Sequence, residues 1–186
     1  MQPVQRDALI DYVTYSEQRD AVRASVIAAK KLRRFHVGKH LTFLFENPTT
    51  VRYQVQEMMR IERIVKESDI QHELDTYNEL LGGDGQLGAT LLVEIDDEAA
   101  RTVLLTRWID AIPTLYLLLP DGTKARATYD ERQIGRGRLS SVQYLKFDVG
   151  GATPVAIGCD HSDPLLDQEY TLTQAEQEAL TTDLAS

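Results

Sequence analysis

A short polar stretch at residues 54–63 contains the side chains best suited to bind a ligand. It holds two amides, one carboxylate and two guanidinium groups: Gln54, Gln56, Glu57, Arg60 and Arg63. Guanidinium groups bind oxyanions through paired hydrogen bonds, amides orient a ligand, and a carboxylate can act as acid, base or metal ligand. The stretch therefore predicts a binding site for a protein partner or a small acidic ligand. The simpler interpretation is an exposed helix with ion pairs three or four residues apart, such as Glu57/Arg60.

Two residues outside this stretch support an alternative interpretation. Glu94 lies on the same strand face as Thr90 and Leu92, and His161 follows a strand end. If that face is buried, Glu94 needs a cationic partner, which we expect to be an arginine of the 56–63 helix. A mixed site of Glu57, Glu94 and His161 would suit iron, manganese or zinc in a small metalloenzyme or hydrolase. None of the four histidines is expected to form an H-x-x-x-H or H-E-x-x-H pair on a helix, so the first interpretation predicts no metal and no cofactor.

A strand at 51–56 and a helix at 56–67 are expected to position the polar stretch. Apolar and polar residues alternate from Val51 to Val55, which is typical of a half-buried strand. This strand would pair with a strand at 41–45 to form a hairpin. From Gln56 onward good helix formers follow, and one face would carry Met58, Ile61 and Val65. The polar side chains at the junction would then converge on one recess.

The remaining pattern predicts an α+β fold, with a mostly antiparallel sheet of about seven strands and about four helices. Further helices are expected at 14–34, 68–81 and 98–109 and after a capping box at 173–176, and further strands at 89–95, 114–119, 123–129, 142–149 and 155–159. The passage 89–119 leaves room for one parallel strand pair. We expect a single domain, 1–186, with peripheral segments at 1–13 and 162–186.

Composition excludes several classes of function. The 186 residues carry a formal charge of −9, which argues against general nucleic-acid binding. The single cysteine, Cys159, excludes an internal disulfide and a cysteine-only metal site, and its apolar strand predicts a buried thiol. No apolar run approaches the roughly 20 residues that span a bilayer. Since the N-terminus also lacks a signal-peptide pattern, we expect a cytoplasmic protein.

Positive charge is concentrated in two places. The segment 30–40 contains five cations and two histidines: Lys30, Lys31, Arg33, Arg34, His36, Lys39 and His40. It is either the solvated C-terminus of a helix, where cations complement the helix dipole, or a docking face for an acidic protein. The second place, Gly135–Arg138, has the composition of a mobile basic loop.

Several of these segments resemble a bacterial family catalogued as a domain of unknown function, number 3501 (DUF3501). The resemblance covers about residues 15–162, and its most specific part is Gln-Val-Gln-Glu-Met-Met-Arg-Ile-Glu-Arg at 54–63. It also includes the segments 41–47, 73–80, 89–95 and 141–144 and the pair Asp160-His161. The chain departs from the family pattern at 82–85, which is glycine-rich, and after His161, where Ser162-Asp163-Pro164 replaces a compact His-Pro-x-Tyr.

The resemblance implies a context and not a reaction. Members of the family are typically encoded beside a rubrerythrin-like diiron protein and an iron–sulfur oxidoreductase of the heterodisulfide-reductase type. What this implies is an accessory protein of a redox or peroxide-defence module, with those two proteins as expected partners. The departure after His161 weakens the transfer of a family role to that residue.

Overall fold

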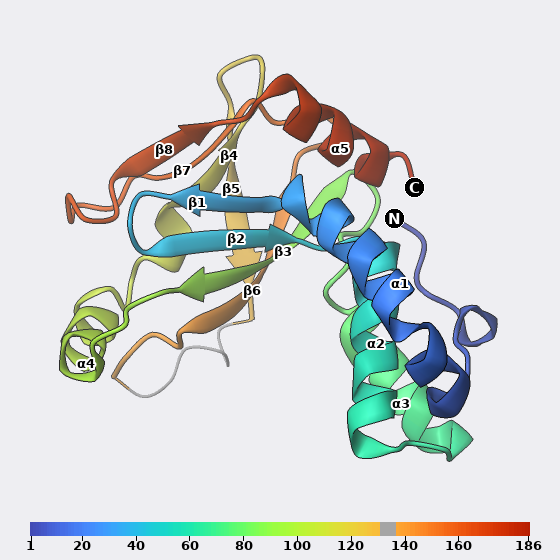
Figure 1. Ribbon diagram of the computed structural model, residues 1–186. Helices are drawn as coiled ribbons and strands as arrows, with labels where there is room; N and C mark the ends of the chain where they lie inside the picture. Colours follow the sequence, from blue (N-terminus) through green and yellow to red (C-terminus); the bar gives the residue numbers. More distant parts are fainter. Residues whose placement is uncertain (131–136) are drawn as a thin grey trace.

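An antiparallel sheet of eight strands forms the larger part of the computed structural model, which describes residues 1–130 and 137–186 (Figure 1). The strands are β1 Arg34–Val37, β2 Leu41–Phe45, β3 Gln86–Val93, β4 Leu115–Leu118, β5 Lys124–Tyr129, β6 Val142–Asp148, β7 Ala156–Cys159 and β8 Gln168–Thr171. Their order is β1-β2-β3-β6-β5-β4-β7-β8, and every pairing among these described strands is antiparallel. The edge strands β1 and β8 also contact each other, so the sheet curls into a nearly closed barrel.

The barrel closes around one continuous apolar core. Side chains alternate along each strand, so every second residue points inward, as Phe43, Leu91 and Phe147 do. At the closure, the ring centroid of Phe35 on β1 lies 6.0 Å from that of Tyr170 on β8. Two helices add to the same core: α4 (Glu98–Arg107) contributes Leu105, and α5 (Gln174–Leu184) contributes Leu180.

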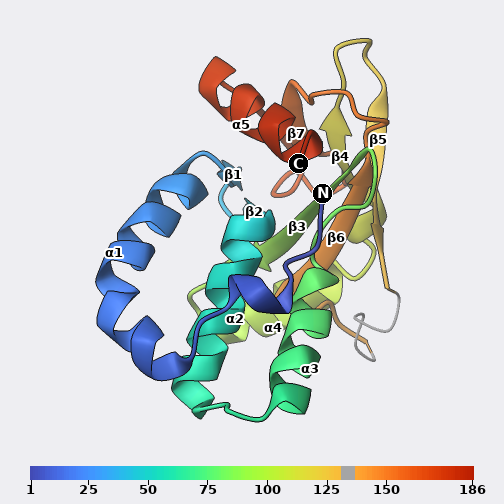
Figure 2. The ribbon, with the colours of Figure 1, turned by 90° about the vertical axis from the view of Figure 1, so that its right-hand side faces the viewer.

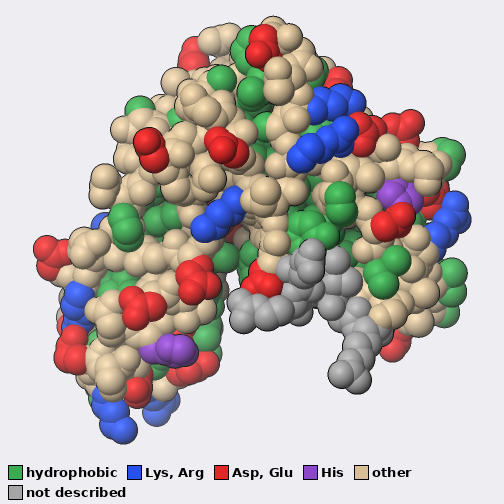
Figure 3. Space-filling model, turned by 180° about the vertical axis from the view of Figure 1, so that it is seen from behind, with side chains coloured by type: hydrophobic (Ala, Val, Ile, Leu, Met, Phe, Trp, Pro, Cys, Tyr) green, Lys and Arg blue, Asp and Glu red, His purple; other side chains and the backbone are tan. Residues whose placement is uncertain are grey.

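Three helices form a separate layer beside the barrel: α1 (Tyr12–Lys31), α2 (Pro48–Glu62) and α3 (Glu67–Asn78). Helix α1 packs on α2, and α2 packs on α3 (Figure 2). This helical layer has its own apolar core, made of Val4, Leu9, Val51, Val55, Met59, Ile70, Leu74 and Leu81. From behind, the surface is hollowed between the helical layer and the barrel (Figure 3). Two short 3-10 helices, η1 (Arg6–Ala8) and η2 (Ile112–Thr114), complete the described elements.

The α+β class and the mostly antiparallel sheet are confirmed. Eight strands and five α-helices are found in the described part of the chain, against the predicted seven and four. The additional strands β1 and β8 are each four residues long. The expected parallel pair is wrong, because β3 and β4 are not neighbours in the sheet. The segments predicted to be peripheral supply core residues, including Val4, Leu166 and Leu180.

The predicted strand at 51–56 is wrong, and with it the hairpin to 41–45. Residues Pro48–Glu62 form one helix, α2, and β2 pairs with β1 and β3 instead. Asn47 caps α2 by accepting a hydrogen bond from the Thr50 N–H, and Pro48 occupies the first turn. Because Val51, Val55 and Met59 recur every four residues, they form the buried face of this helix.

Several predicted details of the helices also differ. The face predicted to carry Met58, Ile61 and Val65 is largely exposed, since Ile61 is 62% exposed and Val65, which follows the end of α2, is 69% exposed. Helix α1 begins at the cap Asp11 and not at Thr14. No helix among the described residues is long and apolar enough to span a membrane. The predicted basic loop falls partly at 135–136, outside the described residues.

Candidate functional site

Glu57 lies at the centre of a polar cluster that joins α1 to α2. Its Oε1 accepts a hydrogen bond from the Tyr15 hydroxyl at 2.6 Å. The Arg19 guanidinium donates to both carboxylate oxygens, at 2.8 and 3.0 Å. Arg60, one turn further along α2, donates to Oε2 at 3.2 Å. The Glu57 side chain is only 11% exposed, so we call these four residues the Glu57 cluster.

This arrangement fixes the protonation states of the cluster. Burial alone would raise the pKa of Glu57, but hydrogen bonds from Arg19, Tyr15 and Arg60 outweigh it and lower that pKa to about 2. Burial, followed by the hydrogen bond to Glu57, raises the pKa of Tyr15 far above its ordinary value. At neutral pH the carboxylate is therefore ionised and the phenol keeps its proton. A carboxylate so stabilised is a poor general acid or base.

The two amides of the polar stretch do not join this cluster. The Gln56 side chain is buried, accepts a hydrogen bond from the Ile10 N–H at 2.8 Å and donates one to the Ile10 carbonyl at 3.0 Å. Through these two hydrogen bonds, Gln56 attaches the N-terminal segment around Ile10 to α2. Gln54 is half-buried on the same helix. The structure brings Glu57 and Arg60 together as predicted, but the recess shared by all five residues does not form.

Arg63 is exposed at the end of α2 in a left-handed conformation with φ of 53°. Its backbone N–H donates to the Met59 carbonyl and so caps the helix. Among the described residues, Arg63 is the only residue other than glycine that has a positive φ. Glycine is the residue that normally takes this position, because a Cβ is unfavourable there.

Glu94 follows the end of β3, and its partners come from β1 and β2. Its carboxylate accepts hydrogen bonds from the Thr42 hydroxyl at 2.7 Å and from Arg34 at 3.3 Å. The prediction that an arginine of the 56–63 helix binds Glu94 is therefore wrong. The Thr42 hydroxyl gives its proton to Glu94, so the His36 Nδ1 at 2.8 Å donates to Thr42.

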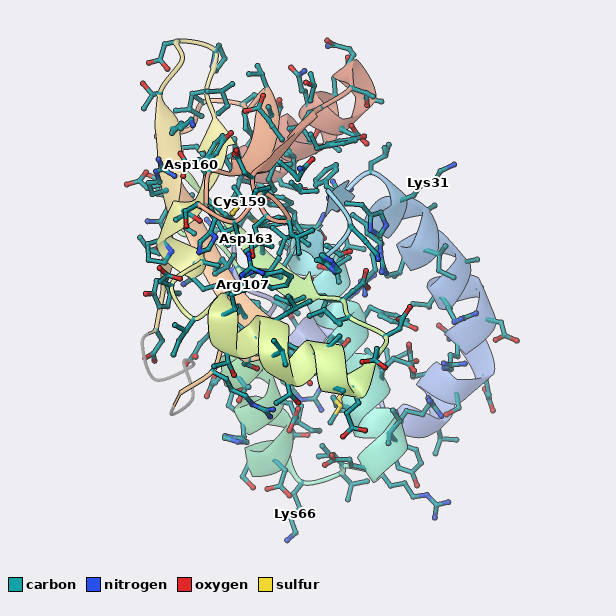
Figure 4. All side chains as sticks on the ribbon, turned by 90° about the vertical axis from the view of Figure 1, so that its left-hand side faces the viewer. Lys31, Lys66, Arg107, Cys159, Asp160 and Asp163 are labelled. Carbon is teal, nitrogen blue, oxygen red and sulfur yellow. The ribbon has the colours of Figure 1, made fainter. Side chains whose placement is uncertain are left out.

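His161 is buried in another network, at the C-terminal end of β7. Its Nδ1 accepts a hydrogen bond from the Asp163 N–H at 3.0 Å, so its Nε2 carries the proton and donates to Asp110 at 3.1 Å. The Asp163 carboxylate in turn accepts from the Trp108 indole at 2.6 Å and from Arg107 at 2.8 Å. Both nitrogens of His161 are thus used within the protein (Figure 4 labels the neighbours Arg107, Asp160 and Asp163).

The structure does not bring Glu57, Glu94 and His161 together, because each belongs to a separate network with its own partners. In the ranges 1–130 and 137–186, no three His, Cys, Asp or Glu side chains are grouped so that they could hold a metal ion. The nearby Cys159 is a buried thiol, as predicted, and burial raises its pKa.

The basic segment 30–40 is divided among different surroundings. Arg33 points into the protein and forms a buried ion pair with Asp183, at 2.7 and 2.9 Å. Arg34 pairs with Glu94, and the Lys30 ammonium lies 5.4 Å from the ring centroid of Tyr53. Arg33 is therefore unavailable to a docking partner.

Sequence reasoning missed Tyr15 and Arg19, which bind Glu57 from 42 and 38 residues away. Their spacing in α1 offered one signal. Positions 15 and 19 lie one helical turn apart on the same face, as a pair that contacts one partner must. Only the packing of α1 on α2 identifies that partner.

Comparisons with known proteins agree with this fold. The crystal structure of a "novel protein of unknown function" from Burkholderia pseudomallei K96243 is 35% identical, with a TM-score of 0.87 over 98% of this chain and 100% of that chain. The search of curated proteins found no match. A family model described as "Protein of unknown function (DUF3501)" matches residues 3–184. The chain therefore belongs to the DUF3501 family.

Proposed function

We propose that this chain is a non-catalytic binding protein that docks a protein partner through the corner between α2 and α3. We call this corner the tip surface and define it by Arg60, Ile61, Arg63, Val65 and Lys66. It lies at the end of the helical layer, and Lys66 projects from it in Figure 4. The single observation that carries the proposal is the exposure of two large apolar side chains there, Ile61 and Val65.

The composition of the tip surface is that of an interface. Exposed apolar side chains that gather in one place are unfavourable in water unless something covers them. Arg60, Arg63 and Lys66 neighbour Ile61 and Val65 in the sequence, and arginine is enriched where proteins bind one another. Glu62 and Asp69 lie at the same corner, so the surface is mixed in charge. A partner with an apolar centre and carboxylates placed opposite Arg60 and Arg63 would fit it.

The chemistry of the Glu57 cluster also favours binding over catalysis. Its carboxylate is ionised and is already hydrogen-bonded by Tyr15, Arg19 and Arg60. The cluster therefore serves to hold α1 and the end of α2 in place beside the tip surface. The family resemblance names the partners to test first, a rubrerythrin-like diiron protein and an iron–sulfur oxidoreductase.

The test measures binding of both candidate proteins, from the same genome, to the immobilised chain under reducing, low-salt conditions. Val65→Ser and Arg63→Ala should each weaken binding by about tenfold or more, because they remove an apolar anchor and a charge. The matched control is Val103→Ser on α4, since Val103 is 65% exposed and Val65 is 69% exposed. Binding should weaken with salt. Capture of neither protein, or equal losses for Val65→Ser and Val103→Ser, would refute the proposal.

A further inference from the structure

A second surface feature, separate from the tip surface, is a pocket at one end of the barrel. Helix α4 lies at this end, as do the β1–β2 turn and the β7–β8 loop (Figure 1). The pocket has a volume of about 1050 Å³ and is lined by the β1–β2 turn, the segment between β3 and α4, α4 itself, Ser141 and Leu165. The mouths of β-barrels are frequent sites for small ligands. None of its described lining residues belongs to the tip surface or the Glu57 cluster, and we call it the α4 pocket.

His40, in the β1–β2 turn, places a buried hydrogen-bond acceptor on the wall of the α4 pocket. It is only 7% exposed, and the ring centroids of His40 and Trp108 are 5.3 Å apart. Its Nδ1 lies 3.1 Å from the Glu94 carbonyl oxygen, which can only accept, so Nδ1 carries the proton of the neutral ring. Nε2 is then an acceptor, and no donor to it is found among the described residues. Because buried polar atoms are normally hydrogen-bonded, Nε2 is available to a donor that enters the pocket.

The charges on the wall favour a cationic ligand. Three carboxylates line the pocket, those of Glu94, Asp96 and Asp97, together with two cations, Lys39 and Arg101. Arg101 is used within the protein, since it donates to two backbone carbonyls of the segment between β3 and α4, at 3.0 and 3.3 Å. Asp96 is exposed, and its carboxylate has no partner in the described part of the chain. It can therefore supply the counter-charge for a bound cation, whereas an anion would be repelled by the excess of carboxylates.

Aliphatic side chains form the rest of the wall. They are those of Val93, Ile95, Ala100, Leu104 and Leu165. Leu165 is 46% exposed, so a ligand that covers it removes apolar surface from water. The described lining residues include no Phe, Tyr or Trp, so the apolar part of the ligand need not be flat.

We propose that the α4 pocket binds a small hydrophobic amine in its protonated form. The ammonium group donates a hydrogen bond to His40 Nε2, and the Asp96 carboxylate neutralises its charge. An ammonium group fits these two acceptors because it carries three donors and no acceptor. The apolar part of the amine covers Ile95, Leu104 and Leu165. This site is independent of partner binding at the tip surface.

The probes are hexylamine, cyclohexylamine and phenethylamine, titrated to millimolar concentration against the isotope-labelled full chain and followed by amide chemical shifts. At least one should shift the amides of residues 38–41 and 93–101. Hexanoate and 1-hexanol, which keep the chain but lack the positive charge, should bind about tenfold more weakly or not at all. Methylamine, which keeps the charge but lacks the apolar part, should also bind more weakly.

Variants of the two acceptors test the assignment. His40→Phe keeps a ring beside Trp108 but removes the acceptor, and should lower the affinity for the best amine by about tenfold or more. Asp96→Asn should lower that affinity by about threefold or more and leave thermal unfolding unchanged. Asp20→Asn, on the exposed face of α1, is the matched control and should bind like the wild type. Lys39→Met should bind the amine at least as tightly as the wild type, because it removes a like charge.

Three results would overturn the proposal. The first is that no amine shifts the amides of the α4 pocket, and the second is that hexanoate binds as tightly as hexylamine. The third is that Asp96→Asn binds the amine as tightly as Asp20→Asn does. Because Asp96 is exposed, this last comparison decides the matter even if His40→Phe fails to fold.

Discussion

The barrel and the helical layer each bury a carboxylate, but the two are supported very differently. Asp183 on α5 accepts hydrogen bonds from Arg33 at 2.7 and 2.9 Å and from Asn47 at 3.0 Å. It therefore joins α5 to the start of β1 and to the cap of α2, above a continuous apolar core. Glu57 joins only α1 to α2. Of the twenty described residues of α1, two are buried, Tyr15 and Val26.

This difference shows that the loss of similar polar contacts can destabilise either the whole domain or a single helix. A contact placed on a large shared core can fail only when that core opens, so its loss is felt by the whole domain. A contact that attaches one thinly packed helix can fail alone, through local opening. We therefore expect the barrel to unfold cooperatively and α1 to detach at a lower free energy.

The largest effect is expected for Asp183→Ala. This change leaves the buried Arg33 guanidinium without its counter-ion, which typically costs about 3–5 kcal/mol. Urea denaturation should show a lower midpoint for the whole domain, and amide exchange should speed up in β1, β2 and α5 together. Faster exchange in α5 alone would show that Asp183 stabilises only α5. It would contradict the expectation that the loss of Asp183 destabilises the whole domain.

A smaller and more local effect is expected for Glu57→Gln. Arg19 and Arg60 lose an ionic partner, but their side chains are 31% and 30% exposed, so water compensates in part. We expect a loss of about 1–3 kcal/mol, seen as faster amide exchange in α1 while the barrel amides keep their rates. The control is Glu17→Gln on the exposed face of α1, which should leave exchange unchanged. Equal acceleration in α1 and the barrel would contradict the local attachment.

The difference in unfolding free energy between the wild type and Glu57→Gln should depend on pH, which provides an independent check. The pKa of Glu57 is lowered from 4.5 to about 2, so the folded state gains stability from its charge above pH 4.5. This gain is lost as the pH falls from 4.5 through 2, because the folded protein then also binds the proton. The gap in unfolding free energy between wild type and Glu57→Gln should therefore be constant near neutral pH and narrow over that window. A gap that stays constant down to pH 2 would show that the charge contributes nothing.

Local signals in the sequence predicted much of the fold. The capping box at Thr173 and Glu176, the helix expected at 98–109, which is α4, and the strand expected at 89–95, which is β3, are all confirmed. Each depends on interactions within one element, so a short window contains all the information. The strands β1 and β8 were not predicted, since four residues carry little pattern and both are stabilised by pairing with distant segments.

Helix α2 shows why a clear pattern can mislead. Val51 and Val55 satisfy a period of two and also a helical spacing of four, so alternation alone cannot distinguish the structures. The deciding signal was Asn47-Pro48, which reads either as a turn or as a cap followed by a first-turn proline. In the candidate site, too, contacts within one helix could be predicted and contacts between helices could not. The local pair Glu57/Arg60 is confirmed, but Tyr15 and Arg19 required the packing of two helices.

The smallest effect is expected at Arg63, where the helical layer keeps an arginine in a left-handed conformation. Arg63→Gly should stabilise the protein by about 0.5–1 kcal/mol, because glycine adopts a positive φ without a clash. The matched control is Arg52→Gly in the exposed interior of α2, which should destabilise by about 1 kcal/mol. Urea denaturation of both variants measures this contrast. If Arg63→Gly is more stable yet binds the partner more weakly, the tip surface keeps its arginine for recognition at the expense of stability. If the Arg63→Gly variant is less stable than the wild type, the Arg63 side chain itself stabilises the corner between α2 and α3. Single contacts would then contribute to folding stability in the helical layer as well as in the barrel.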